Sequence, residues 1–121
     1  MNFNLSEEQN LIRESVRDFA EREITPVARE LDEKAIFSND LTKKMRDLGL
    51  FGMNIPDKYG GQGLDTLSYI IAVEEIARID ASQAATLAAH NSLGISPIYE
   101  FGTESQKMKS LPGLCTGDAL W

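Results

Sequence analysis

The sequence predicts an all-α domain of about five to seven helices, packed as an orthogonal or up-down bundle. Three observations support this fold class. Apolar residues recur at helical spacing along most of the chain. Two Ser/Thr-x-x-Gln patterns have the form of helix-capping boxes. No stretch shows the strict apolar-polar alternation of a half-buried strand. The length of 121 residues corresponds to one domain.

The composition narrows the classes of function. The net charge of −7 disfavours nonspecific binding to nucleic acid or to an anionic membrane, because both partners would be repelled. A single cysteine excludes an intrachain disulfide and a thiolate metal site. Because the chain has a single histidine, most histidine-based metal sites and catalytic triads are excluded, and we expect no metal site. We see no apolar run of the roughly 18–20 residues that a membrane-spanning helix needs.

The first predicted helices occupy residues 6–34. Ser6 and Gln9 form a capping box, and an apolar stripe follows it at helical spacing. Thr25-Pro26 then places a proline where a first helical position tolerates it. A second, shorter apolar stripe ends in the polar residues 32–34. The sequence leaves open whether these are two helices or one kinked helix.

A third helix begins at Ser38 or Asn39, presents Leu48 as part of its apolar stripe, and stops at Gly49. Residues 50–63 are predicted to form the one long irregular stretch, because Pro56 and the glycines of 59–63 oppose regular structure.

In the carboxy-terminal half, the sequence predicts four more helical stretches. A fourth helix opens at Asp65 or Thr66 and is interrupted or bent at residues 80–82. An alanine-rich fifth helix runs from about residue 82 to 93, and Ser96-Pro97 starts a short helix or turn. Residues 103–106 form a second capping box, whose helix is expected to end near Pro112-Gly113.

The chain shows signs of an incomplete bundle. The fourth and fifth helices are apolar over much of their circumference, which suggests that something covers more than one face. Ala119-Leu120-Trp121 is an apolar end without a cap or a charged tail. We interpret it as a cut across a continuing segment; the alternative is that Trp121 folds back onto the core. The amino terminus has no signal or transit pattern, which favours a cytoplasmic, bacterial-like protein.

No residue stands out as catalytic. His90 lacks a partner signature, so a packing or hydrogen-bonding role is expected. Cys115 is interpreted as an inert thiol in a loop. Glu74 and Glu75 point about 100° apart on a helix, so they cannot act as a pair on one atom. The glycine run 59–63 lacks the lysine and the preceding strand of a phosphate-binding loop.

Several motifs occur together in a characteristic order. They are Leu5-Ser6-Glu7-Glu8-Gln9, Phe19, Pro26, Asp32, Leu48-Gly49-Leu50-Phe51-Gly52, Pro56, Tyr59-Gly60-Gly61-Gln62-Gly63, Glu74-Glu75-Ile76-Ala77-Arg78, Phe101-Gly102-Thr103-Glu104-Ser105-Gln106-Lys107, and Leu111-Pro112 through Gly117. In order and spacing, this set resembles the amino-terminal helical domain of the acyl-CoA dehydrogenase family over essentially the whole chain.

The resemblance implies a fragment of a longer flavoenzyme. Such enzymes add a middle β domain and a carboxy-terminal helical bundle. With FAD, they oxidise acyl-CoA to trans-2-enoyl-CoA in fatty-acid or branched-chain amino-acid catabolism, and they pass electrons to electron-transferring flavoprotein. The catalytic glutamate and most flavin contacts would lie outside this chain, which would be inactive alone. Residues 1–118 would form the helical domain and 119–121 the start of the middle domain. A homo-oligomeric parent is implied.

The same resemblance places the acyl chain along the alanine-rich helix, at Ala85, Thr86, Ala89 and Leu93. Small residues leave room for a hydrocarbon tail, although they would equally allow tight helix packing. Short or branched substrates are favoured by overall similarity. Two alternatives remain: a stand-alone helical domain that binds acyl chains or a protein, and a related enzyme with another flavin reaction, such as acyl-CoA oxidation by oxygen or nitroalkane oxidation.

Overall fold

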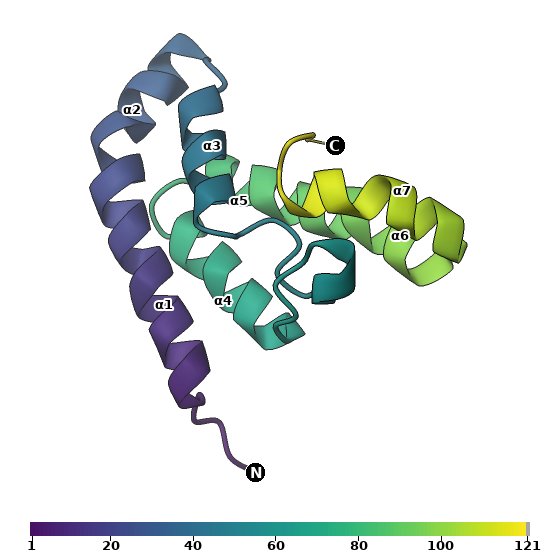
Figure 1. Ribbon diagram of the computed structural model, residues 1–121. Helices are drawn as coiled ribbons and strands as arrows, with labels where there is room; N and C mark the ends of the chain where they lie inside the picture. The colour runs from purple at the N-terminus through teal and green to yellow at the C-terminus, as the bar shows by residue number, and fades with distance from the viewer. Residues whose placement is uncertain (121) are drawn as a thin grey trace.

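The computed structural model describes residues 1–120 and confirms the all-α prediction (Figure 1). This part of the chain forms seven α-helices and contains no strand. Their bounds are Glu7–Phe19 (α1), Thr25–Lys34 (α2), Asn39–Asp47 (α3), Thr66–Ala77 (α4), Ala81–Ala89 (α5), Ser96–Phe101 (α6) and Glu104–Cys115 (α7). Two π-helical segments, Ala20–Ile24 (η1) and His90–Ile95 (η3), and a 3-10 turn, Asp57–Tyr59 (η2), complete them. Trp121 and its predicted role lie outside the described residues.

The open question about the first two helices is settled by η1, which joins α1 to α2 in one continuous rod (Figure 1). A proline ring inside an α-helix collides with the carbonyl four residues earlier, here that of Arg22. The π segment avoids this, because Thr25 donates its backbone N–H to Ala20, five residues back. Pro26 therefore widens the helix locally and does not end it.

The same solution joins α5, η3 and α6. Ser96 donates its backbone N–H to the carbonyl of Asn91, again five residues back, and Pro97 follows. The sequence therefore predicts the position of the disturbance, but the helix continues through it. The predicted break at residues 80–82 is real, since α4 ends at Ala77 and Asp80 caps α5 by accepting from the backbone N–H of Ser82.

The predicted helix starts are confirmed by their hydrogen bonds. Both capping boxes are complete, at Ser6 and at Thr103. Ser38 caps α3 and Asp65 caps α4, each through its side-chain oxygen. Leu48 departs from its predicted place in the buried stripe of α3, because it lies beyond the last helical residue and is half exposed.

The end of α7 corrects the prediction. The helix continues through Pro112 to Cys115, so Cys115 is a helical residue and not a loop residue. Leu111, Leu114 and Cys115 are all buried in one apolar cluster. Burial of a leucine stabilises by about 1.5–3 kcal/mol, and two leucines offset the roughly 3 kcal/mol that a proline costs inside a helix.

Two apolar clusters hold the helices together. The larger one gathers side chains of α1, α3, α4 and α5, including Phe19, Met45, Ile76 and Leu87. The smaller one joins the 50–63 segment to η3 and α7. The segment η3 contributes Ile95 to the smaller cluster, and the preceding α5 contributes Leu87 to the larger one. No helix in residues 1–120 is long and apolar enough to cross a membrane.

Candidate functional site

The four predicted site residues lie on the outer side of α5 and η3. Ala85 is exposed, Thr86 and Ala89 are half buried, and Leu93 keeps 69% of its surface accessible. The Thr86 hydroxyl donates to the Ser82 carbonyl at 3.1 Å, so it is already engaged within the helix. The structure therefore places the four residues along one helix, in contact with solvent in this chain.

The inner side of the same helix is buried. Ala84, Leu87 and Ile95 are at most 4% exposed and pack into the two clusters. The helix thus buries apolar side chains together with the polar Gln83, and it retains apolar residues on its exposed face. Its inner face is held in a packed core, so the exposed residues occupy defined positions.

His90 has the packing and hydrogen-bonding role predicted for it. Its side chain is 1% exposed, and Nε2 lies 2.8 Å from the carbonyl oxygen of Leu114. The imidazole also packs edge-on against the Phe51 ring, with 4.7 Å between the ring centroids. These contacts tie η3 to α7 and to the irregular segment.

Asn91 is a positioned residue that sequence reasoning missed. It is 2% exposed, its Oδ1 accepts the backbone N–H of Gly52 at 2.6 Å, and its Nδ2 donates to the Leu50 carbonyl at 3.1 Å. A polar residue at an inward helical position was the available signal, because a buried amide must find partners.

The neighbouring helix α4 also exposes apolar side chains. Leu67 is 47% exposed and Ile70 is 49% exposed. The Tyr69 hydroxyl donates to the Ala88 carbonyl at 3.2 Å and holds α4 alongside α5. This surface can therefore contact a hydrocarbon chain or another protein surface.

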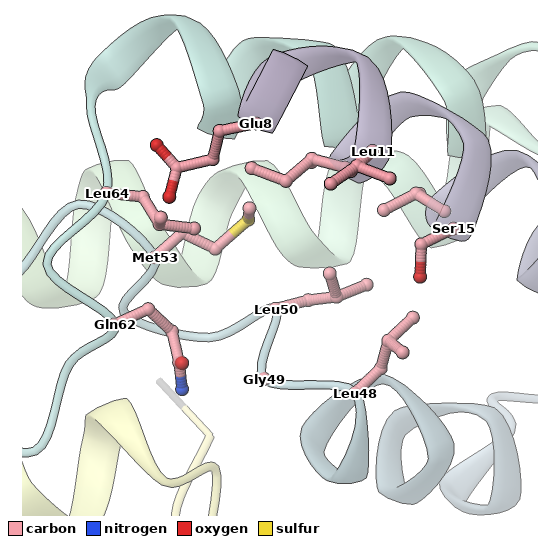
Figure 2. A pocket seen from close by; sticks show the side chains of 11 residues that line it. Glu8, Leu11, Ser15, Leu48, Gly49, Leu50, Met53, Gln62 and Leu64 are labelled. Atoms are coloured by element: carbon pink, nitrogen blue, oxygen red, sulfur yellow. The ribbon is translucent and has the colours of Figure 1, made fainter.

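A separate cleft of about 260 Å³ lies between α1 and residues 48–64 (Figure 2). Figure 2 shows Leu11 and Ser15 reaching from α1 toward Leu48 and Leu50, with Met53 beside them. Glu8 is the only charged residue among those that line the cleft. None of the four predicted site residues contributes to it, so it is distinct from the surface of α5 and η3.

Other candidate groups have structural roles. The N–H groups of Gly60, Gly61, Gln62 and Gly63 all donate to carbonyls of the chain itself, so this loop offers no phosphate cradle. Burial raises the pKa of the Cys115 thiol to about 11, which agrees with the prediction of an inert cysteine. Within residues 1–120, no group of three or more His, Cys, Asp or Glu side chains could hold a metal ion.

Comparisons with known proteins agree on one family. A family profile described as "Acyl-CoA dehydrogenase, N-terminal domain" matches residues 6–118. The probable acyl-CoA dehydrogenase YngJ of Bacillus subtilis is 48% identical over 120 residues, which are 99% of this chain and 32% of the relative.

Two solved structures extend the likeness to three dimensions. Butyryl-CoA dehydrogenase from Megasphaera elsdenii has a TM-score of 0.92 at 43% identity, covering 99% of this chain and 32% of that one. A glutaryl-CoA dehydrogenase from Mycobacterium smegmatis, solved in complex with FADH2, has a TM-score of 0.89 at 31% identity, covering 96% of this chain and 30% of that one. The chain therefore spans about a third of the length of these proteins.

Proposed function

The chain belongs to the family of acyl-CoA dehydrogenase amino-terminal domains, and we propose that it forms one wall of the acyl pocket in a flavoprotein acyl-CoA dehydrogenase. The observation that carries this proposal is the exposed apolar row Ala85, Ala89 and Leu93 on a helix whose opposite face is fixed in the core. A hydrocarbon tail needs an apolar slot that is formed before it binds.

The reaction proposed for the complete enzyme is the α,β-dehydrogenation of an acyl-CoA thioester to trans-2-enoyl-CoA. A carboxylate base outside this chain would take the α-proton. FAD, when bound, supplies the acceptor for the hydride that leaves the β-carbon. Electron-transferring flavoprotein is the proposed onward electron acceptor, and the complete enzyme is proposed to be a homo-oligomer.

The contribution of this chain is binding and exclusion of water. The methyl groups of Ala85 and Ala89 leave space above the helix, and Leu93 adds apolar surface. Each methylene of a tail removed from water stabilises the complex by about 0.8 kcal/mol. Because the carboxylate base is proposed to lie outside this chain, the isolated chain is proposed to be inactive.

Most of the flavin contacts are proposed to lie outside this chain. The amides of the glycine-rich loop, which superficially resemble an anion cradle, are satisfied within the chain. This loop therefore offers no free amides to a flavin phosphate, and no step of the redox chemistry is derived from this chain.

Short or branched acyl groups are the proposed substrates. One of the two solved structures named above is a butyryl-CoA dehydrogenase, and its similarity covers 99% of this chain. The length of the slot also depends on residues outside this chain, so the proposal concerns the class of substrate and not one thioester.

Anaerobic titration of the full-length polypeptide that carries this chain tests the proposal. We expect butyryl-CoA to bleach the flavin absorbance and to yield the enoyl product. A protein without flavin would favour the stand-alone binding domain, and a flavin that no acyl-CoA reduces would favour a reaction such as nitroalkane oxidation; either result would reject the dehydrogenase. A reduced flavin that oxygen reoxidises rapidly would favour acyl-CoA oxidation by oxygen.

A further inference from the structure

We propose that Asn91 is a positioning residue, which holds the π segment η3 so that Ala89 and Leu93 stay in line with Ala85 along the proposed acyl wall. This inference rests on the proposed function, since it concerns the register of the same wall. It assigns to a buried asparagine an influence on substrate selection without any contact with the substrate.

The first step is the attachment of Asn91 to the irregular segment. Its side chain amide is 2% exposed and engages Gly52 and Leu50 through two hydrogen bonds, of 2.6 and 3.1 Å. Gly52 has φ of +66°, and an added Cβ would lie 2.7 Å from Cβ of Cys115 on α7. The segment that holds Asn91 is therefore itself confined against another helix.

The second step is the stabilisation of the π turn. The main-chain carbonyl of Asn91 accepts the backbone N–H of Ser96 and also its hydroxyl, at 3.0 Å. Pro97 follows and disfavours α geometry, because its ring would meet the carbonyl of Leu93. The side chain of Asn91 thus bonds to the irregular segment, and its main chain bonds across the widened turn.

The third step is the consequence for the exposed face. Each residue of an α-helix rotates the chain by about 100°, so four residues overshoot a full turn by about 40°. A π turn closes over more residues and rotates less per residue. From Ala89 to Leu93 the π geometry therefore reduces this drift, and Leu93 remains closer to the line through Ala85 and Ala89.

A purely structural role makes a different prediction from a positioning role. Loss of stability lowers the amount of active enzyme equally for every substrate, so it cancels in a ratio of two kcat/KM values. A shifted wall changes the binding of long tails more than that of short tails. The ratio of kcat/KM for octanoyl-CoA to that for butyryl-CoA therefore separates the two roles.

The test uses the full-length polypeptide with Asn91→Ala and Ser96→Ala, each against the parent. We expect each substitution to change the octanoyl-to-butyryl ratio by about threefold or more, which is the order of the effect of burying a single methylene group. Ser38→Ala serves as the control, because it removes the cap of α3 far along the chain from η3 and should leave the ratio unchanged.

Each outcome supports or overturns the inference. If Asn91→Ala fails to fold, Ser96→Ala alone decides, since it removes only a half-buried hydroxyl. An unchanged ratio in every folded variant of the pair would overturn the inference while leaving the dehydrogenase intact. A parent polypeptide without acyl-CoA-dependent flavin reduction would instead show that the proposed function itself is wrong.

Discussion

Glu75 shows how a single charged residue fixes two helices to one another. It is 3% exposed on α4, and its two carboxylate oxygens accept from Nε and Nη2 of Arg17 on α1, both at 2.9 Å. Arg13 and Arg78 lie within 3.7 and 3.4 Å of the same carboxylate. The adjacent Glu74 is exposed, so the two glutamates face different surroundings, as predicted.

The pH dependence of stability is expected to reflect this residue. The hydrogen bond from Arg17 lowers the pKa of Glu75 below its ordinary value of 4.5. The ion pair of Glu75 and Arg17 therefore stabilises the folded state fully above pH 4.5, the ordinary pKa. This stabilisation is lost as the pH falls toward the lowered pKa of the folded state. Glu75→Gln should cost about 1–2 kcal/mol at neutral pH, because Arg17 is half exposed, and should lose less stability than the parent on acidification.

Urea unfolding from about pH 7 to pH 3 measures this difference. The lowered pKa values of Asp65 and Glu23 contribute to acid sensitivity equally in both proteins, so only the gap between the two curves matters. If the free energy of unfolding falls with pH in parallel in the parent and in Glu75→Gln, the proposed role of Glu75 is contradicted.

Ala89 is the residue at which a larger side chain should narrow the proposed slot. In the full-length polypeptide, Ala89→Leu is expected to reduce kcat/KM for octanoyl-CoA by about tenfold or more and to affect butyryl-CoA less, because added bulk excludes a longer tail first. Steady-state kinetics with the two thioesters measure this. Ala77→Leu, at an exposed helical position on α4, is the matched control. Equal effects of Ala89→Leu on both substrates would contradict an acyl wall.

Among the helices, local signals predicted the starting points well. The capping residues Ser6, Ser38, Asp65 and Thr103 each accept the expected backbone N–H. Such caps act within one turn, so the sequence contains the information that determines them.

The cap of α4 permits a direct test. Asp65 accepts from the backbone N–H of Ser68 at 2.7 Å and from Nε2 of Gln9 at 2.9 Å, so it also connects α4 to α1. Asp65→Ala should destabilise the chain by about 1 kcal/mol, whereas Asp65→Asn should keep most of the stability, since asparagine caps equally well. Thermal unfolding at fixed protein concentration measures both. Equal losses of stability in Asp65→Ala and Asp65→Asn would show that the helix cap is not the source of the stabilisation by Asp65.

The elements that the sequence did not predict depend on competition between distant interactions. From sequence alone, Thr25-Pro26 and Ser96-Pro97 are typical of helix starts. In the structure each helix continues through a π turn at these positions, because it is packed on both sides of the turn. Pro112 reads as a stop, but the burial of Leu111 and Leu114 extends α7 past it. Asn91 was missed because its partners lie about forty residues away.

The candidate site was predictable only through family resemblance. Periodicity places Ala85 and Ala89 on a helix, and the structure shows them on its accessible side. Neither helical spacing nor composition reveals what occupies that side. The assignment of the acyl wall therefore stays a prediction, whereas the fold and the family are confirmed.

Across the molecule as a whole, the exposed apolar side chains predict self-association of the 121-residue chain. They are spread over several helices and include Leu67, Ile70, Leu93, Phe101 and Met108. The net charge of −7 opposes association, so added salt should strengthen it by screening. Sedimentation velocity at several protein and salt concentrations measures this effect.

The double substitution Leu93→Ser and Phe101→Ser is the matched variant. It removes two of the most exposed apolar side chains and should shift the chain toward monomer by reducing the apolar surface that association buries. A parent chain that stays monomeric at every concentration, with a sharp thermal transition, would contradict the interpretation that these faces need a cover.

The proposed role of this chain is to serve a larger flavoenzyme as its helical acyl-binding wall. The intact mass of the native gene product, measured together with its visible absorbance, is the decisive measurement. Because 13.4 kDa here corresponds to 32% of a relative's length, we expect a mass of roughly 40 kDa with co-purifying flavin. A native product of 13.4 kDa without flavin would contradict this role and would leave binding as the function.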